Sequence, residues 1–104
     1  MGWIYLLWAS VFEIIFTVSL KYTEGYSKLL PSTIATSFAI ASIVSLSKAL
    51  NYIPIGGAYA IWTGVGTIGA NLLGMILFHE SLDLMKVLYM MMVLGGVLGL
   101  KSVI

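Results

Sequence analysis

The sequence predicts an all-α membrane protein with four transmembrane helices. Its 104 residues are 61% hydrophobic and only 9% charged, whereas about a quarter of the residues in a soluble domain carry a charge. Short polar clusters divide the chain into apolar runs, each close to the roughly 20 residues that a helix needs to span a bilayer. The runs are continuous rather than alternating, which argues against β spans. Helices also satisfy their own backbone groups inside lipid.

The whole chain forms one predicted domain, residues 1–104, with spans at approximately 3–20, 29–47, 55–78 and 84–104. No basic region or cleavage site accompanies the first run, so we expect a retained span rather than a signal peptide. Pro31 falls in the first turn of the second span, where its missing N–H is tolerated. Ser81 or Asp83 can cap the fourth span, because either side chain can accept from its free N–H groups.

Composition excludes several kinds of site. The chain has no Cys and a single His, His79, so the sequence predicts neither disulfides nor a metal site. It has no arginine, no basic cluster that would bind nucleic acid and no G-x-x-x-x-G-K-[ST] phosphate-binding pattern. The cluster of His79, Glu80 and Asp83 is typical of a solvated loop rather than of a proton relay. We therefore expect no cofactor and no enzymatic activity.

The lysines do not favour one orientation in the membrane. The loops after the first and third spans carry Lys21, Lys28 and Lys86. The opposite side carries Lys48, Lys101 and the terminal amine. The positive-inside rule compares these two groups, and they nearly balance. Either another feature fixes the orientation, or the same chain inserts both ways and two copies pair antiparallel.

Glu13 lies near the middle of the first span, which is otherwise uncharged as far as Leu20. A carboxylate at that depth costs at least ~2.5 kcal/mol, and such residues handle ions or protons by default. At helical spacing, Ser10, Phe16 and Thr17 share its face, where they can support a carboxylate or pack on an organic cation. Alternatively, the hydroxyls bond to their own helix and the ring faces lipid. Ser42 in the second span can reach the same depth or be a satisfied helix serine.

Aromatic residues in the third span point to a cation site. Tyr59, Trp62 and Thr63 share one face, and Trp62 lies about 12 Å beyond Pro54 at 1.5 Å per residue. That depth exceeds the usual position of a Trp in an interfacial belt. Together with a carboxylate, the two rings can bind a cation through their π faces. The alternative is that both rings are core aromatics.

Glycines occur where they can affect bending and association. Gly64 and Gly66 remove side chains from the middle of the third span, which lowers the cost of a bend. Gly95 and Gly99 form a G-x-x-x-G pair in the fourth span, a spacing that lets helix backbones approach closely. The pair predicts a contact between subunits or, alternatively, packing within one subunit.

Several stretches resemble the small multidrug resistance transporters of bacteria, over the full length of the chain. They are Glu13 in the first span, Leu20–Tyr26, Leu30–Ser32 and Ile53–Gly66. The resemblance implies proton-coupled export of small organic cations across the plasma (inner) membrane by an antiparallel dimer. It also implies a role for each residue of the following set: Glu13 for protons and substrate, Ser42, Tyr59 and Trp62 for the pocket, Gly64 and Gly66 for a bend, and Gly95 and Gly99 for the dimer contact.

The subtype is indicated by individual positions. The ending Gly99–Lys101 resembles the guanidinium exporters, and Ala39 stands where the quaternary ammonium exporters have tyrosine. Ser10 and Phe16 stand where guanidinium exporters have glycine and tryptophan. We therefore favour guanidinium or substituted guanidinium compounds. The alternatives are broad export of quaternary ammonium and other lipophilic cations, or a subunit that pairs with a paralogue.

Two further classes compete with a carrier. A non-transporting membrane subunit would move no cation when purified, and a channel would pass current without proton exchange.

Overall fold

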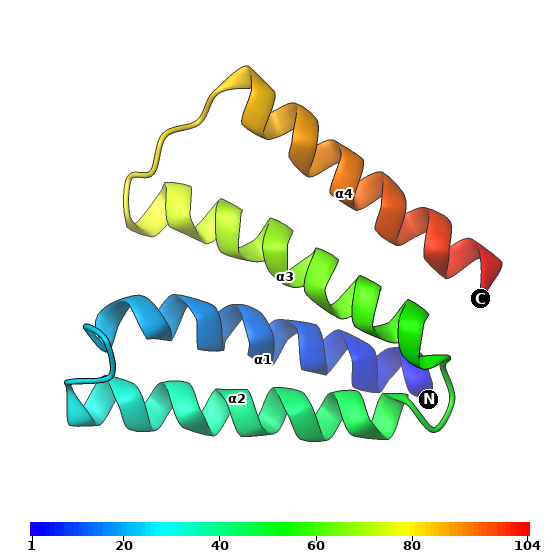
Figure 1. Cartoon of the computed structure of the whole chain (residues 1–104), viewed down its shortest axis with the longest axis horizontal. Helices are drawn as coiled ribbons and strands as arrows, with labels where there is room; N and C mark the ends of the chain where they lie inside the picture. Colours follow the sequence, from blue (N-terminus) through cyan, green and yellow to red (C-terminus); the bar gives the residue numbers. More distant parts are fainter.

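The computed structural model describes residues 1–104 as four helices joined by short connections (Figure 1). They are α1 (Gly2–Tyr22), α2 (Leu29–Ala49), α3 (Ile55–Leu77) and α4 (Leu84–Val103). All four are long and apolar enough to cross a membrane. The predicted all-α architecture with four transmembrane helices is therefore confirmed for the single subunit. Both termini lie at the same end of the bundle, opposite the α1–α2 turn and the α3–α4 loop (Figure 1).

Local side-chain contacts fix where helices begin. Asp83 precedes α4 and accepts a hydrogen bond from the backbone N–H of Lys86 at 2.8 Å, so it is the cap that the sequence placed at Asp83 or Ser81. Pro31 lies in the first turn of α2. In the α1–α2 turn, buried Thr23 donates to the carbonyl of Leu20 at 2.7 Å. These contacts satisfy helix-end groups that have no partner within the helix itself.

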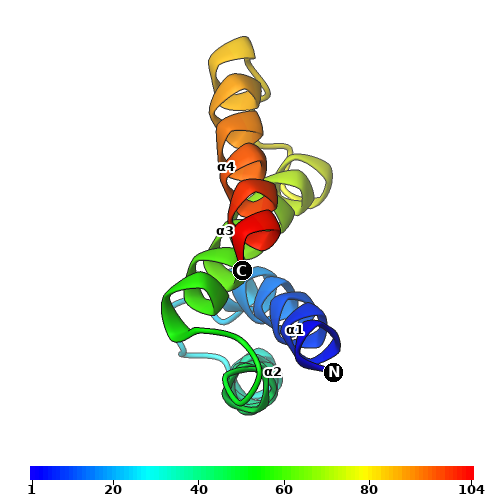
Figure 2. The same ribbon diagram turned by 90° about the vertical axis from the view of Figure 1, so that its right-hand side faces the viewer.

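The subunit is a thin slab measuring 41 × 35 × 16 Å. The Cα cylinder of a helix is about 4.6 Å wide and packed helix axes lie about 8–10 Å apart, so the slab is at most two helices deep. α1 packs against α2 and α3, whereas the backbone of α4 approaches only α3. Figure 2 shows α4 standing beyond α3, away from α1 and α2. Only 14 of the 104 residues are buried, so most apolar side chains lie at least partly on the surface of the subunit.

Two glycines of α3 let neighbouring helices approach it from different sides. A Cβ on Gly64 would lie 2.5 Å from Cγ2 of Val97 in α4. A Cβ on Gly69 would collide with the side chain of Ile14 in α1. α3 is one continuous helix through both positions. Gly64 is thus a contact with α4 in this structure, and the bend expected at Gly64 and Gly66 stays a prediction.

Replacing Gly69 with alanine should destabilise the α1–α3 contact. The added methyl group would overlap Ile14, whose β-branched side chain is restricted in a helix, and overpacking of this kind costs about 1–3 kcal/mol. Denaturant titration of the purified protein in micelles, followed by circular dichroism, measures the free energy of unfolding. Gly56→Ala is the matched control, because a Cβ there meets nothing within 4 Å. Equal stability of the two variants would show that the close approach is not stabilising.

Candidate functional site

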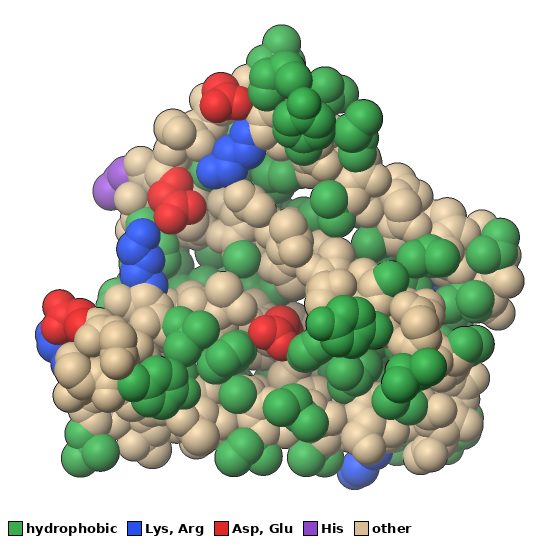
Figure 3. All heavy atoms as spheres, in the orientation of Figure 1, with side chains coloured by type: hydrophobic (Ala, Val, Ile, Leu, Met, Phe, Trp, Pro, Cys, Tyr) green, Lys and Arg blue, Asp and Glu red, His purple; other side chains and the backbone are tan.

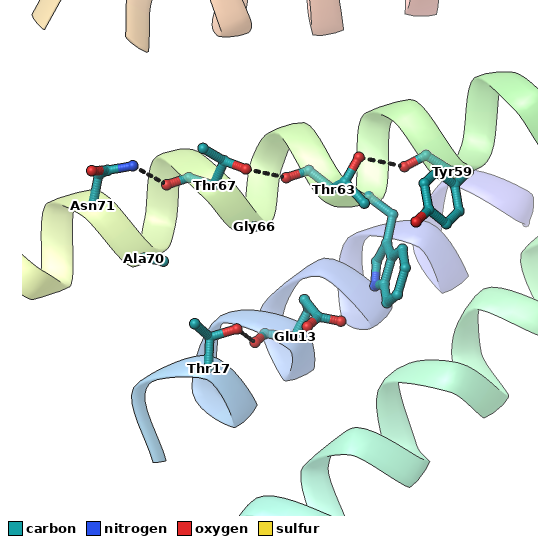
Figure 4. A pocket seen from close by; sticks show the side chains of 9 residues that line it. Glu13, Thr17, Tyr59, Thr63, Gly66, Thr67, Ala70 and Asn71 are labelled. Atoms are coloured by element: carbon teal, nitrogen blue, oxygen red, sulfur yellow. Dashed lines mark hydrogen bonds between the residues drawn. The ribbon is translucent and has the colours of Figure 1, made fainter. Parts of the chain in front are cut away.

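A cavity of about 500 Å³ lies between α1 and α3. Its lining, called here the Glu13 cavity, consists of Glu13, Thr17, Tyr59, Trp62, Thr63, Gly66, Thr67, Ala70 and Asn71 (Figure 4). In the space-filling view, an isolated acidic side chain stands amid hydrophobic and neutral atoms in the middle of the slab (Figure 3). Most other charged side chains gather at the margins (Figure 3).

Glu13 reaches the cavity because α3 leaves room for it. Gly66 is buried directly opposite, and a Cβ there would lie 3.3 Å from Cγ of Glu13. A larger residue at this position would press on the stem of the glutamate. The α1 stretch around Glu13 is otherwise apolar or neutral, so no cation on its own helix neutralises the carboxylate near mid-span.

Polar side chains on the cavity wall donate their hydrogens to the backbone. Thr63, Thr67 and Asn71 donate to the carbonyls four residues earlier, at 2.9, 2.8 and 2.8 Å (Figure 4). Thr17 donates in the same way to the backbone carbonyl of Glu13 at 2.9 Å. A hydroxyl has one hydrogen and two acceptor lone pairs, and an amide oxygen is an acceptor. What remains for a ligand is therefore a set of acceptor oxygens beside a carboxylate, together with the second N–H of Asn71, and the surplus of acceptors suits a cation with N–H donors.

Tyr59 and Trp62 form an aromatic wall at one end of the cavity. Their ring centroids are 5.6 Å apart with an interplanar angle of 64°, an edge-on arrangement. Tyr59 is 58% exposed, so much of its surface is available to a ligand or to a second subunit. Aromatic faces attract cations electrostatically, so this wall and the carboxylate favour the same kind of ligand.

A buried hydrogen-bond junction holds the Trp62 ring. Its Nε1 donates to Ser42 Oγ at 2.9 Å and to the Ala9 carbonyl at 3.3 Å. Ser42 Oγ donates to the same carbonyl at 2.7 Å. Ser42 and Ala9 are both fully buried. In an α-helix the carbonyl of Ala9 also accepts from the N–H four residues on, that of Glu13. α1, α2 and α3 therefore meet one turn away from the carboxylate.

The structure brings together five of the expected site residues. Glu13, Tyr59, Trp62, Thr63 and Gly66 all line the Glu13 cavity. Ser42 lies behind the cavity wall, where it holds Trp62. It therefore contacts the indole rather than the open space.

Ser10 and Phe16 do not line the Glu13 cavity in the single subunit. Ser10 is buried and donates to the carbonyl of Leu6 at 2.9 Å, which is the back-bonding alternative. It borders a different cavity of about 310 Å³ between α1, α3 and α4. Phe16 is partly buried on α1. Their expected roles in the substrate pocket stay predictions.

Gly95 and Gly99 lie on the open face of α4. A Cβ added to either would meet nothing within 4 Å. The alternative that this pair packs within the subunit is therefore wrong. The expected contact with a second subunit stays a prediction.

Thr67 and Asn71 also line the cavity, although neither was expected from the sequence. A signal was present, because Thr63, Thr67 and Asn71 follow one another at spacings of four. Residues four apart share a helix face. Polar residues repeated at that interval in an apolar span predict a polar stripe.

Comparison with known proteins gives a family match. The family model described as Small Multidrug Resistance protein matches residues 1–93. A protein of Proteus vulgaris named guanidinium exporter is 45% identical over 101 residues, which are 97% of this chain and 97% of that protein. Proteins with the same name from Citrobacter freundii and Salmonella typhimurium strain LT2 are 42% and 43% identical over 101 residues, covering 97% of this chain and 96% of each relative.

Removing the Ser42 hydroxyl should loosen the junction. Ser42→Ala leaves the indole N–H with only the longer bond to the Ala9 carbonyl, and a buried polar group that loses its partner costs about 1–3 kcal/mol. We expect lower stability to denaturant and a broadened indole N–H resonance for Trp62 in the NMR spectrum. Ser47→Ala is the control, because that serine is exposed on the same helix. If both variants match the parent protein, the junction is not a stabilising contact.

Proposed function

The chain belongs to the Small Multidrug Resistance family, and we propose that it is a proton-coupled antiporter that exports small organic cations, with guanidinium compounds favoured. It is a multi-pass protein of the bacterial inner membrane. The observation that carries the proposal is the carboxylate of Glu13 near mid-span, in a cavity with aromatic and acceptor-rich walls. This combination attracts positive charge and offers nothing comparable to an anion.

The acceptor oxygens favour guanidinium compounds over quaternary ammonium compounds. A guanidinium ion is planar, carries N–H donors in its plane and stacks on aromatic faces. It can therefore use the carboxylate, the aromatic rings and the oxygens of Thr63, Thr67 and Asn71. A quaternary ammonium ion has no N–H donor, so it would interact only with the carboxylate and the aromatic rings. The relatives named guanidinium exporters agree with this preference.

Coupling follows from the cost of a charge in the membrane. A carboxylate in the hydrocarbon region is costly, and either a proton or a bound cation neutralises Glu13. When Glu13 is neutralised, the cavity can switch from being open to one side of the membrane to being open to the other. When Glu13 is charged and the cavity is empty, this switch is disfavoured. Since proton and cation compete for the same group, an inward proton gradient expels the cation.

We propose that the working unit is an antiparallel dimer in which two copies of Glu13 share one pocket. The slab is only 16 Å deep, and its cavity is open on one face, so one subunit supplies only part of an enclosure. The outer face of α4 with Gly95 and Gly99 has no partner within the subunit, and small residues of this spacing favour helix association. A paralogue in place of the second copy is the alternative.

Glu13→Gln should abolish guanidinium-driven proton movement. The amide keeps the size of the side chain but can neither bind a proton at physiological pH nor neutralise a cation. The measurement is proton release from proteoliposomes, or charge movement on solid-supported membranes, upon addition of guanidinium.

Glu24→Gln is the matched control, because Glu24 lies in the exposed α1–α2 turn and pairs with Lys28. Coupled movement retained by Glu13→Gln would refute the mechanism. If the parent protein is silent alone and active with a paralogue, the heterodimer is the working form.

Thr67→Val should separate the two classes of cation. Valine keeps the shape of threonine but removes the acceptor oxygen, and a hydrogen bond to a charged group is worth enough to raise the KM for guanidinium roughly tenfold. The KM for a tetraalkylammonium ion should not change. Thr33→Val is the control, since Thr33 makes the same kind of backbone bond, to the carbonyl of Leu29 at 2.8 Å, on another helix. Equal effects on both cations would contradict the hydrogen-bonding role.

A further inference from the structure

The Glu13 cavity continues toward the α3–α4 loop as a smaller cavity of about 230 Å³, called here the mouth cavity. The two cavities share Thr17, Ala70 and Asn71 in their linings. The mouth cavity ends at Lys21, Phe78 and Glu80. The two adjacent cavities therefore extend together from the carboxylate at mid-span to a second carboxylate, Glu80, at the end of α3.

Lys21 occupies this boundary in the manner of a bound cation. Its Nζ lies 3.3 Å from Oε2 of Glu80 and 4.7 Å from the centroid of the Phe78 ring. The ring of Tyr22 packs against the ring of Phe78, and their centroids are 5.4 Å apart. A carboxylate and an aromatic face thus hold an ammonium group, which is the same chemistry that the Glu13 cavity offers.

The position of Glu80 is built into the backbone. The chain turns back at His79, which has a positive φ of 55°. The N–H of Glu80 donates to the carbonyl of Gly74 at 3.3 Å. Gly74 is buried, and a Cβ there would collide with the Glu80 carboxylate. The carboxylate is therefore held over the last turn of α3, where the negative end of the helix dipole adds to its attraction for a cation.

The ion pair is open to exchange. The side chains of Lys21 and Glu80 are 55% and 43% exposed, and exposed pairs of this kind contribute about 0–1 kcal/mol. An arriving cation can therefore displace the ammonium of Lys21 at little cost.

We propose that Glu80 and Phe78 form a cation subsite at the mouth of the transport route, and that the ammonium of Lys21 is its resident competitor. The subsite would take the same class of ligand as Glu13, a small organic cation with N–H donors, and the inference rests on the proposed export function. A cation passing between solvent and Glu13 would exchange with Lys21 on the way. In an antiparallel dimer, each side of the membrane would carry one such subsite.

If Lys21 competes with the substrate for Glu80, substitutions of these two residues should change the KM for guanidinium in opposite directions. Glu80→Gln removes the attraction and should raise the KM for guanidinium roughly two- to fivefold, a range appropriate to an exposed charge pair. Lys21→Met removes the competitor and should lower the KM by a similar factor. The double variant should behave like Glu80→Gln. A pair that only stabilises the fold would shift the KM in the same direction in both single variants.

The test is charge movement on solid-supported membranes with guanidinium, at low salt, for the parent protein, the two single variants and the double variant. Glu24→Gln and Lys28→Met are matched controls, because Glu24 and Lys28 form an exposed pair at 3.2 Å and line neither cavity. They should leave the KM unchanged. An unchanged KM in both single variants, or shifts of the same sign, would overturn the subsite while Glu13-dependent transport still stands.

A second readout keeps the two proposals separate. Guanidinium is titrated into Glu13→Gln protein, and NMR follows the amide of Gly74 and the ammonium of Lys21. Shifts at both groups, lost in Glu13→Gln/Glu80→Gln, would support the subsite even if the parent protein transports nothing. The absence of such shifts would overturn it.

Discussion

The carbonyl of Ala9 is the contact on which the rest of the site depends. Ser42 and Trp62 both donate to it, and the N–H of Glu13 reaches the same oxygen through the regular bond of the helix. The angle of the indole over the cavity and the height of the carboxylate are thus set at one buried point. Hydrogen bonds in such a low-dielectric region are strong when complete and costly when one partner is lost.

The face with the Glu13 cavity and the outer face of α4 carry different kinds of side chains. The face with the Glu13 cavity combines one charge, two rings and several acceptor oxygens, whereas the outer face of α4 is apolar and carries the glycines. α3 stands between them, and its glycines let α1 and α4 approach from separate sides. A single helix therefore positions both the site and the surface that we propose for assembly.

The sequence was sufficient for the features that depend on local pattern. Apolar runs predict the four helices, the chain position of Glu13 predicts a carboxylate near mid-span, and helical spacing places Tyr59 and Trp62 on one face. Contacts that depend on how the helices cross could not be predicted from the sequence. Ser42 supports Trp62 rather than facing the cavity, and Glu80 pairs with a lysine 59 residues away. That pairing requires the reversal at His79 and the bare backbone of Gly74, which no spacing rule reveals.

The hydrogen bonds from Thr63, Thr67 and Asn71 to the backbone affect how easily α3 enters the bilayer. Because each side chain donates a hydrogen to its own helix, these polar groups of α3 already have a partner before the helix packs against anything else. These bonds therefore lower the cost of placing a polar stripe in the bilayer before the cavity is enclosed. Insertion of the helix and its later packing against neighbouring helices are then separate steps.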